Sequence, residues 1–278
     1  MFVDSHCHLD GHRFDGDRKE VIARAIEAGI TNALAIGTGD GPGTLDCALK
    51  LAQQHDFLYA SIGIHPHEAE LAKESDFAEL EQLSRRPKVI AWGEIGLDYY
   101  YDHSPRDIQK NIFVAQMEMA RAAKLPIVIH CRPSEGSENA WQDCLDLLEQ
   151  HWKPSGLRGI LHCFTGSWPH AKRALDMGFM ISFAGNVTFP KAQPIRDIVP
   201  QVPLASMLIE TDSPYLAPIP YRGKRNEPAF VKETAGHIGE LRGLSADEIG
   251  FRTAQNFYGF FSLAEPRAKA FNQGGHRG

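Results

Sequence analysis

The sequence lacks the features that would place the chain in a membrane or direct it to secretion. No stretch of its 278 residues approaches the roughly 18 consecutive apolar residues that a membrane span needs. The first residues also lack a basic segment followed by an apolar secretory core. We therefore expect a cytoplasmic protein that makes no contact with a membrane.

Cysteine is scarce, and its five positions (7, 47, 131, 144 and 163) suggest neither a disulfide framework nor a close zinc-binding pair. Such usage suits a reducing compartment. Cys7, Cys131 and Cys163 each follow a histidine, but alternation along a strand turns neighbouring side chains to opposite faces. We interpret these three cysteines as buried packing residues on the helix side of a sheet, not as metal ligands.

The chain also lacks an excess of basic residues and any glycine-rich phosphate loop. Its formal net charge is −6, whereas a protein that coats duplex nucleic acid by charge alone is usually basic. Neither a Gly-x-Gly-x-x-Gly nor a Walker-type motif is present. Any contact with nucleic acid should therefore be local. Hydrophobic residues make up 43% of the chain and charged residues 23%, enough apolar material for a large core.

Eight short apolar runs alternate with amphipathic segments along the chain. Such alternation predicts a parallel sheet covered by helices on both faces. We expect strands near residues 2–8, 31–37, 57–64, 88–94, 126–130, 159–162, 179–184 and 206–212. The length is only slightly above the roughly 250 residues of a (β/α)8 barrel. We therefore predict an α/β protein that folds as a single (β/α)8 TIM-barrel domain over residues 1–262.

The clearest predicted helix begins at Ser104 and Pro105, because serine is a good N-cap and proline suits the first helical position. A helix over about 228–242 should complete the barrel. Residues 245–261 predict one extra C-terminal helix, packed outside the barrel. Residues 263–278 are polar and glycine-rich, and we expect them to form a flexible tail.

Six potential metal ligands lie where the predicted strands end. His6 and His8 are two residues apart, so both point to one face of the first strand. Four later runs end on a further candidate each: Glu94, His130, His162 and Asp212. In a (β/α)8 barrel the carboxyl ends of the strands converge on one open face. An open doubly wound sheet shows the same alternation, but these six residues meet far more easily across a closed barrel.

Seven sequence strings together resemble the TatD family of metal-dependent deoxyribonucleases. They are Asp4-Ser5-His6-Cys7-His8-Leu9, Gly63-Ile64-His65-Pro66-His67, Gly93-Glu94-Ile95-Gly96-Leu97-Asp98-Tyr99-Tyr100, Ile129-His130-Cys131-Arg132, His162-Cys163-Phe164-Thr165-Gly166-Ser167, Glu210-Thr211-Asp212-Ser213-Pro214-Tyr215-Leu216 and Arg225-Asn226-Glu227-Pro228. The resemblance runs from residue 2 to about 261. It implies a (β/α)8 barrel, two divalent metal ions and hydrolysis of DNA phosphodiester bonds, often from a 3′ end.

Carried onto this sequence, the resemblance assigns His6, His8 and Asp212 to one metal and His130 and His162 to the other. Glu94 would bridge the two, since each oxygen of a carboxylate can bind a cation. This mixed nitrogen and oxygen set is compatible with Mg, Mn, Zn or Fe. Asp212 and Glu94 are the predicted catalytic residues, with Asp212 holding and deprotonating the attacking water.

Further polar residues surround these ligands in the sequence. Asp4 and Glu210 would orient ligands from behind or act as buried polar partners. Predicted substrate-binding residues are His65, His67, Arg132, Thr165, Ser167, Arg225 and Asn226. For His65 and His67, substrate contact and loop-holding hydrogen bonds stay equally open. Tyr99, Tyr100 and Tyr215 suit stacking on exposed bases, which favours single-stranded or frayed DNA.

Two other classes of function compete with the nuclease. A small-molecule amidohydrolase or lactonase of the same superfamily would keep the metals and change the substrate. A metal-stabilised binding module would bind DNA without turnover. The intact ligand set and Asp212 argue against the binding module.

Overall fold

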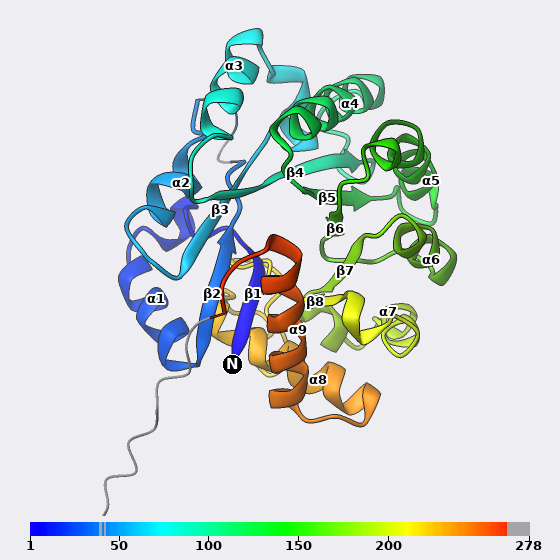
Figure 1. The fold of residues 1–278 in the computed structure, drawn as a ribbon. Helices are drawn as coiled ribbons and strands as arrows, with labels where there is room; N and C mark the ends of the chain where they lie inside the picture. The colour runs from blue at the N-terminus through cyan, green and yellow to red at the C-terminus, as the bar shows by residue number, and fades with distance from the viewer. Residues whose placement is uncertain (39–40, 42, 266–278) are drawn as a thin grey trace, which may run out of the picture.

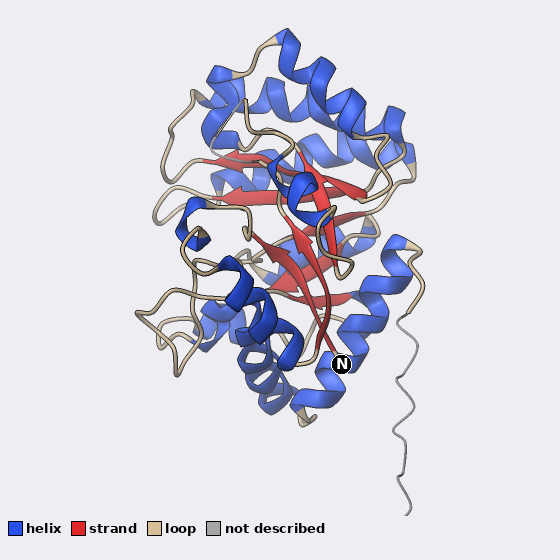
Figure 2. Ribbon diagram, turned by 90° about the vertical axis from the view of Figure 1, so that its left-hand side faces the viewer, coloured by secondary structure: helices blue, strands red, loops and turns tan. Residues whose placement is uncertain are grey.

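The computed structural model describes residues 1–38, 41 and 43–265, and these contain eight parallel strands in the order of the sequence. The strands stand side by side at the centre of the molecule, and the helices lie around them (Figures 1 and 2). Their bounds are β1 (Phe2–Cys7), β2 (Ile30–Ala35), β3 (Leu58–Ile62), β4 (Val89–Asp98), β5 (Ile127–Arg132), β6 (Gly159–Leu161), β7 (Met180–Phe183) and β8 (Met207–Ile209). A parallel bridge between Cys7 and Ser213 joins the segment that follows β8 to the end of β1. The prediction of a (β/α)8 barrel is confirmed.

Helices connect successive strands, as right-handed crossovers of a parallel sheet require. They are α1 (Arg18–Glu27), α2 (Cys47–Ala52), α3 (Glu74–Leu83), α4 (Arg106–Ala123), α5 (Asn139–Leu147), α6 (Trp168–Asp176) and α7 (Gln193–Ile198). Two more helices, α8 (Val231–Arg242) and α9 (Ala246–Phe261), follow the last strand. Within the described part of the chain, no helix is long and apolar enough to cross a membrane. The predicted flexible tail lies almost entirely outside the described residues.

Apolar side chains form two separate clusters, one outside and one inside the barrel. The outer cluster packs strand residues such as Trp92 and Ile129 against the surrounding helices. The inner cluster takes one residue from each of seven strands: Val3, Leu34, Ala91, Val128, Ile160, Met180 and Leu208. Burial of both clusters supplies the main driving force for folding.

Helix α9 covers the amino-terminal opening of the barrel. Phe257, Tyr258 and Phe260 belong to the inner cluster, and α9 lies beside β1 and β8 in Figure 1. We predicted that this extra helix packs outside the barrel. In the structure it lies over one end of the barrel, where its aromatic side chains join the inner cluster. Because the inner residues at this end are apolar, they need an apolar cover, which the aromatic face of α9 provides.

Strand β4 ends four residues later than we predicted, and it contains an irregularity at Glu94. Trp92 pairs with Ile127, whereas Ile95 pairs with Ile129, so three steps along β4 match two along β5. This extra residue is a β-bulge, a feature common beside active sites. Beyond it, Gly96 has φ 139°, and a Cβ there would collide with the carbonyl oxygen of His130. The close approach of β4 and β5 thus requires glycine.

The start of α4 also differs from the sequence prediction. The helix begins at Arg106, and Pro105 occupies the N-cap position. The hydroxyl of Ser104 instead donates to the carbonyl of His67 and accepts from the backbone N–H of Glu70. Ser104 therefore fastens the loop after β3 to the start of α4. At α9 the prediction holds, because Ser245 caps the helix through the N–H of Glu248.

Candidate metal centre

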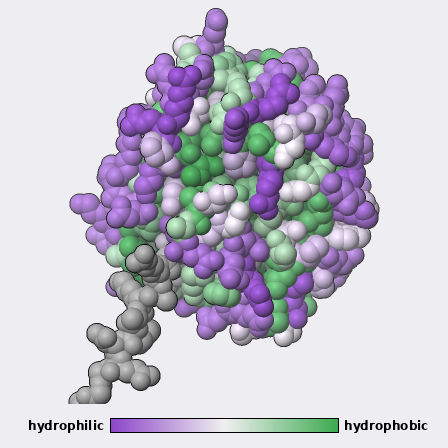
Figure 3. Space-filling model, in the orientation of Figure 1, coloured by the Kyte–Doolittle hydropathy of each residue, from purple (hydrophilic) through white to green (hydrophobic). Residues whose placement is uncertain are grey.

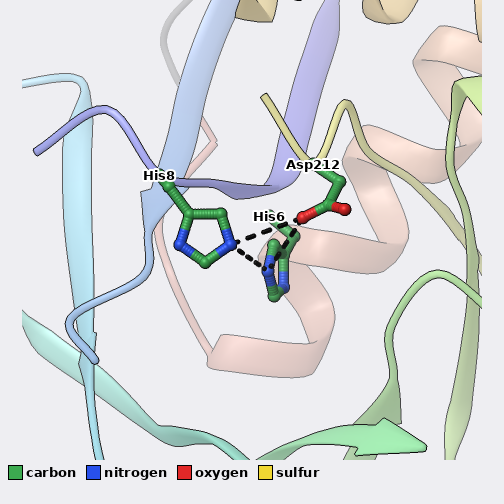
Figure 4. Close-up of side chains that lie close together, drawn as sticks. All are labelled: His6, His8 and Asp212. Atoms are coloured by element: carbon green, nitrogen blue, oxygen red, sulfur yellow. Dashed lines mark hydrogen bonds and ion pairs between the residues drawn. The ribbon is translucent and has the colours of Figure 1, made fainter. Parts of the chain in front are cut away.

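Three predicted ligands meet at the junction of the first and last strands. Nε2 of His6 lies 3.3 Å from Nε2 of His8 and 3.6 Å from Oδ1 of Asp212, and His8 lies 3.4 Å from that oxygen. The side chains of His6 on β1, His8 just after it and Asp212 in the loop after β8 point toward one another (Figure 4). Converging nitrogen and carboxylate atoms at this spacing suit a divalent cation.

The backbone around Asp212 is held in an uncommon conformation. Asp212 has φ 55°, in the left-handed region that non-glycine residues seldom adopt. Its N–H donates to the carbonyl of His6 at 2.9 Å. The buried carboxylate of Asp4 accepts the N–H groups of Thr211 at 2.9 Å and His6 at 3.3 Å. Asp4 therefore joins the two ligand-bearing segments through their backbones, without contacting a candidate ligand side chain.

Glu94 lies between two groups of histidines. Its Oε1 is 2.7 Å from Nε2 of His162 and 2.8 Å from Nδ1 of His130. Its Oε2 faces the other way, 3.4 Å from Nε2 of His6 and 3.7 Å from Nε2 of His8. The β-bulge turns this side chain into the site, where each oxygen serves one group.

Carboxylates behind two of the histidines determine which ring nitrogen faces the site. Nε2 of His130 lies 2.9 Å from Asp98, and Nδ1 of His162 lies 3.2 Å from Glu210. A carboxylate oxygen accepts hydrogen bonds, so the outer nitrogen of each ring donates one. In a metal-loaded centre the inner nitrogen, which faces Glu94, would give up any proton it carries and offer its lone pair to the cation.

Asp98 is a site residue that our sequence reasoning did not assign. Its Oδ2 also lies 2.9 Å from Nε2 of His67, so one carboxylate holds two imidazoles. Burial opposes its charge, but the hydrogen bonds from His130 and His67 outweigh burial and keep the pKa of Asp98 well below its usual range. A signal was present in the sequence, because Glu94, Gly96 and Asp98 alternate along one strand.

The carboxylates of the centre are ionised at neutral pH. Burial disfavours charge on Glu94, but positive charge on histidines, His162 foremost, holds its pKa well below the ordinary value. Burial likewise opposes charge on His8, yet Asp212 and Glu94 raise its pKa to about 9. A cation placed here would replace that proton as the positive partner. Four imidazoles and two ionised carboxylates therefore fit divalent metal ions.

The centre opens into a cavity of about 940 Å³ at the carboxyl ends of the strands. Four predicted substrate-binding residues line it: His65, His67, Arg132 and Thr165. The guanidinium of Arg132 lies over the rings of Tyr100 and Tyr101, at 4.2 and 4.7 Å from their centres. Tyr101 and Tyr215 also border the cavity, and each ring is about half exposed.

Three predicted substrate-binding residues do not line the cavity, because their side chains have structural partners. Ser167 precedes α6, and its hydroxyl lies 3.0 Å from Nδ1 of His170. Arg225 forms an ion pair with Asp17 at 2.5 Å. Asn226 is fully buried, and its amide donates to the carbonyls of Thr211 and Tyr215 beside Asp212. Direct contact of these three residues with a substrate stays a prediction.

Two further side chains differ from expectation. Cys7 and Cys131 are buried in the outer cluster, as we predicted, whereas Cys163 is only partly buried and borders the cavity. Cys163 has φ 42°, which breaks the alternation on which our interpretation depended. Tyr99 is buried, and its hydroxyl donates to Asp143 at 2.7 Å, so this ring is not available for stacking.

A family model described as TatD related DNase matches residues 3–262. The chain belongs to the TatD family. Among TatD relatives, the uncharacterized metal-dependent hydrolase YabD of Bacillus subtilis is 40% identical over 263 residues, covering 95% of this chain and all of that protein. The 3′-5′ ssDNA/RNA exonuclease TatD of Erwinia tasmaniensis is 34% identical, covering 94% of this chain and 99% of the relative.

A solved structure agrees with this assignment. The TatD homologue YjjV from Escherichia coli K12 superposes with a TM-score of 0.86 at 31% identity, covering 95% of this chain and 98% of YjjV. This TatD-family chain is therefore a metal-dependent hydrolase, which excludes the binding module without turnover.

Proposed function

We propose that this hydrolase cleaves DNA phosphodiester bonds with two divalent metal ions, removing nucleotides from the 3′ end of single-stranded or frayed DNA. The observation that carries the proposal is the division of Glu94 between two groups of imidazoles, one at each carboxylate oxygen. Membership of the TatD family and a relative named as a 3′-5′ exonuclease support the choice of substrate.

His6, His8 and Asp212 would hold one cation, His130 and His162 the other, with Glu94 bridging both. When bound, the two cations would activate a water and balance the negative charge that develops on the phosphoryl oxygens. The donor set is compatible with Mg, Mn, Zn or Fe. The stacked rings of His6 and His162, 3.9 Å apart at their centres, keep the two halves of the centre adjacent.

Asp212 is the group that we propose to take the proton of the attacking water. Burial opposes its charge, but the hydrogen bond with His8 and the charges of nearby histidines lower the pKa of Asp212, so its carboxylate is available as an acceptor. Its left-handed backbone and the bond from its N–H to His6 fix its direction. Such placement contributes to general-base catalysis before any proton moves.

The walls of the cavity suit a flexible strand better than an intact duplex. Arg132 and Thr165 offer a guanidinium and a hydroxyl to a phosphate, and His67 also lines the cavity. The half-exposed rings of Tyr101 and Tyr215 suit stacking on bases that are not paired. A net charge of −6 argues against binding along a long duplex by charge alone.

A small-molecule amidohydrolase or lactonase remains the second candidate, and one observation favours it. The cavity of about 940 Å³ has the size of a pocket that encloses a small molecule. In such an enzyme Glu94 would take the bridging place that a carboxylated lysine occupies in many relatives of that chemistry.

One experiment separates the two candidates. Metal-loaded protein is given a single-stranded oligonucleotide labelled at its 5′ or 3′ end, and separately a panel of lactones and amides, with metal content measured on the same sample. We expect a ladder of shortening 5′-labelled products that a chelator abolishes. Rapid lactone hydrolysis with intact oligonucleotide would overturn the nuclease proposal. The free cysteines of the described chain suit a cytoplasmic site of action, which we also propose.

A further inference from the structure

His65 differs from the other histidines of the centre in what lies behind its ring. Its Nδ1 accepts a hydrogen bond from the backbone N–H of His67 at 3.1 Å. This bond caps the short 3-10 helix η2 (Pro66–Leu71), which begins immediately after His65. The ring is thus held in place by a donor, whereas His130 and His162 are held by carboxylate acceptors.

This difference determines the position of the proton on the neutral ring. A nitrogen that accepts a hydrogen bond has used its lone pair, so the proton of His65 must be on Nε2. Nε2 is the nitrogen that faces the centre, 3.5 Å from Oε1 of Glu94. His130 and His162 pair their outer nitrogens with carboxylates, so in a metal-loaded centre their inner nitrogens would offer lone pairs to a cation. His65 would present a hydrogen-bond donor to the same space.

Distance alone would allow another interpretation. Nε2 of His65, Glu94 and His130 are close enough to one another to hold a metal ion. A protonated nitrogen has no lone pair for a cation, so coordination would cost the capping bond to His67 or the neutral state of the ring. The separation of 3.5 Å from Glu94 is also long for a hydrogen bond, which leaves this N–H available to another acceptor.

We propose that His65 is a catalytic residue that donates a hydrogen bond from Nε2 to a non-bridging phosphoryl oxygen of the substrate, and is not a metal ligand. This inference rests on the proposed function for its substrate. The phosphoryl oxygens gain negative charge on the way to the transition state, so a donor aimed there becomes stronger as the reaction proceeds. No proton is transferred, and the ring stays neutral throughout.

The surroundings of His65 favour this role over that of an adaptable surface contact. Its side chain is only 16% exposed and borders the cavity. Its ring lies edge-on to those of His67 and His130, with centres 4.3 and 4.7 Å away. Arg132, by contrast, is exposed at the end of β5 and leans on two tyrosines. A donor held on several sides needs little reorganisation when substrate binds.

Two substitutions of His65 test the accepting role of Nδ1 and the donating role of Nε2 separately. In His65→Asn the short amide oxygen can still accept the N–H of His67, because asparagine is a good cap, but no donor reaches Glu94. In His65→Ala both functions are lost. We expect His65→Asn to keep its melting temperature and its full metal content, and to lose about 10²- to 10³-fold in kcat on an oligonucleotide with little change in KM.

The position of the proton is measured independently of activity. Full-length protein with ¹⁵N-labelled histidines, loaded with zinc, gives long-range ¹H–¹⁵N correlations, and the signals missing from His65→Asn identify His65. We expect a neutral ring protonated at Nε2. A metal-bound Nε2, a loss of one cation in His65→Asn, or normal kcat in that variant would overturn the proposal. If the wild type cleaves no DNA, the proposed function fails, whereas the spectrum and metal content still decide whether His65 is a ligand.

Discussion

The two ends of the barrel interior differ completely in chemistry. At the carboxyl end, buried imidazoles and carboxylates such as His6 and Glu94 face a cavity. At the amino end, the interior contains apolar side chains such as Val3 and Leu208, sealed by Phe257 of α9. Buried ionisable groups cost free energy, whereas buried apolar groups stabilise the fold. One barrel thus separates reactivity from stability along its axis.

This separation predicts that substitutions at the two ends produce opposite outcomes. A change at the carboxyl end should alter turnover or metal binding and leave unfolding almost unchanged. A change at the amino end should lower stability and leave the rate of each folded molecule unchanged.

The largest expected effect on turnover is that of Asp212→Asn. The amide cannot accept the proton of the attacking water, so we expect kcat to fall by about three orders of magnitude. The circular dichroism spectrum should not change, because the backbone bonds around Asp212 do not involve its side chain. Initial rates on a labelled oligonucleotide measure the loss. A near-normal rate at full metal content would remove Asp212 from the mechanism.

At the opposite end, Phe257→Ala should have the largest effect on stability. Phe257 is fully buried in the inner cluster, and removing a buried phenyl ring typically costs about 3–5 kcal/mol. Denaturant unfolding measures the loss, and kcat per folded molecule should match that of the wild type. A matched control is Phe251→Ala on the same helix, where the ring is 44% exposed and the expected loss is small. Equal destabilisation by both variants would contradict the role of α9 as a cover.

Asp98→Asn should have an intermediate effect, on metal affinity. Asp98 accepts on both oxygens, from the two imidazoles at Oδ2 and from the backbone N–H groups of Tyr100 and Tyr101 at Oδ1. The NH₂ group of an amide must face one of these pairs of donors, so the proton position and orientation of His130 are no longer determined. Loss of such a partner typically weakens metal binding about 10- to 100-fold. Titration with a competing chelator measures this. The control Asp143→Asn changes a carboxylate that accepts the hydroxyl of Tyr99 outside the cavity, and it should keep the wild-type metal affinity. Equal affinity in Asp98→Asn would show that His130 needs no such support.

Most of the strands and all six candidate ligands could be predicted from the sequence, because both depend on local signals. Apolar runs predict strands, and a polar residue that ends a run lies on the open face. We did not predict a role for Asp98, because β4 continues beyond a β-bulge that the apolar pattern of residues 88–94 does not reveal. The position of α9 could not be predicted, because it depends on which end of the assembled barrel is apolar and uncovered.

Side-chain partners were the hardest feature to predict. Arg225 and Arg132 are both arginines near a ligand-bearing loop, yet Asp17 pairs with Arg225 while Arg132 faces the cavity. Asp17 lies more than two hundred positions away in the sequence, so only the folded chain brings them together. The same holds for Asn226, whose amide is used by backbone carbonyls.

The smallest expected effect is that of Arg225→Gln, which tests whether this residue belongs with stability or with substrate binding. The hydrogen bond from Arg225 is the main cause that lowers the pKa of Asp17. A group whose pKa is lowered by folding stabilises the protein above its unfolded pKa, about 3.9 for aspartate, and loses that contribution as pH falls through the folded value. Unfolding midpoints of wild type and variant should therefore differ slightly at pH 7 and converge below about pH 4. KM and kcat on the oligonucleotide should be unchanged. A raised KM at neutral pH would instead show that Arg225 contacts the substrate. The substrate-binding surface at the carboxyl end of the barrel would then extend beyond the residues that line the cavity.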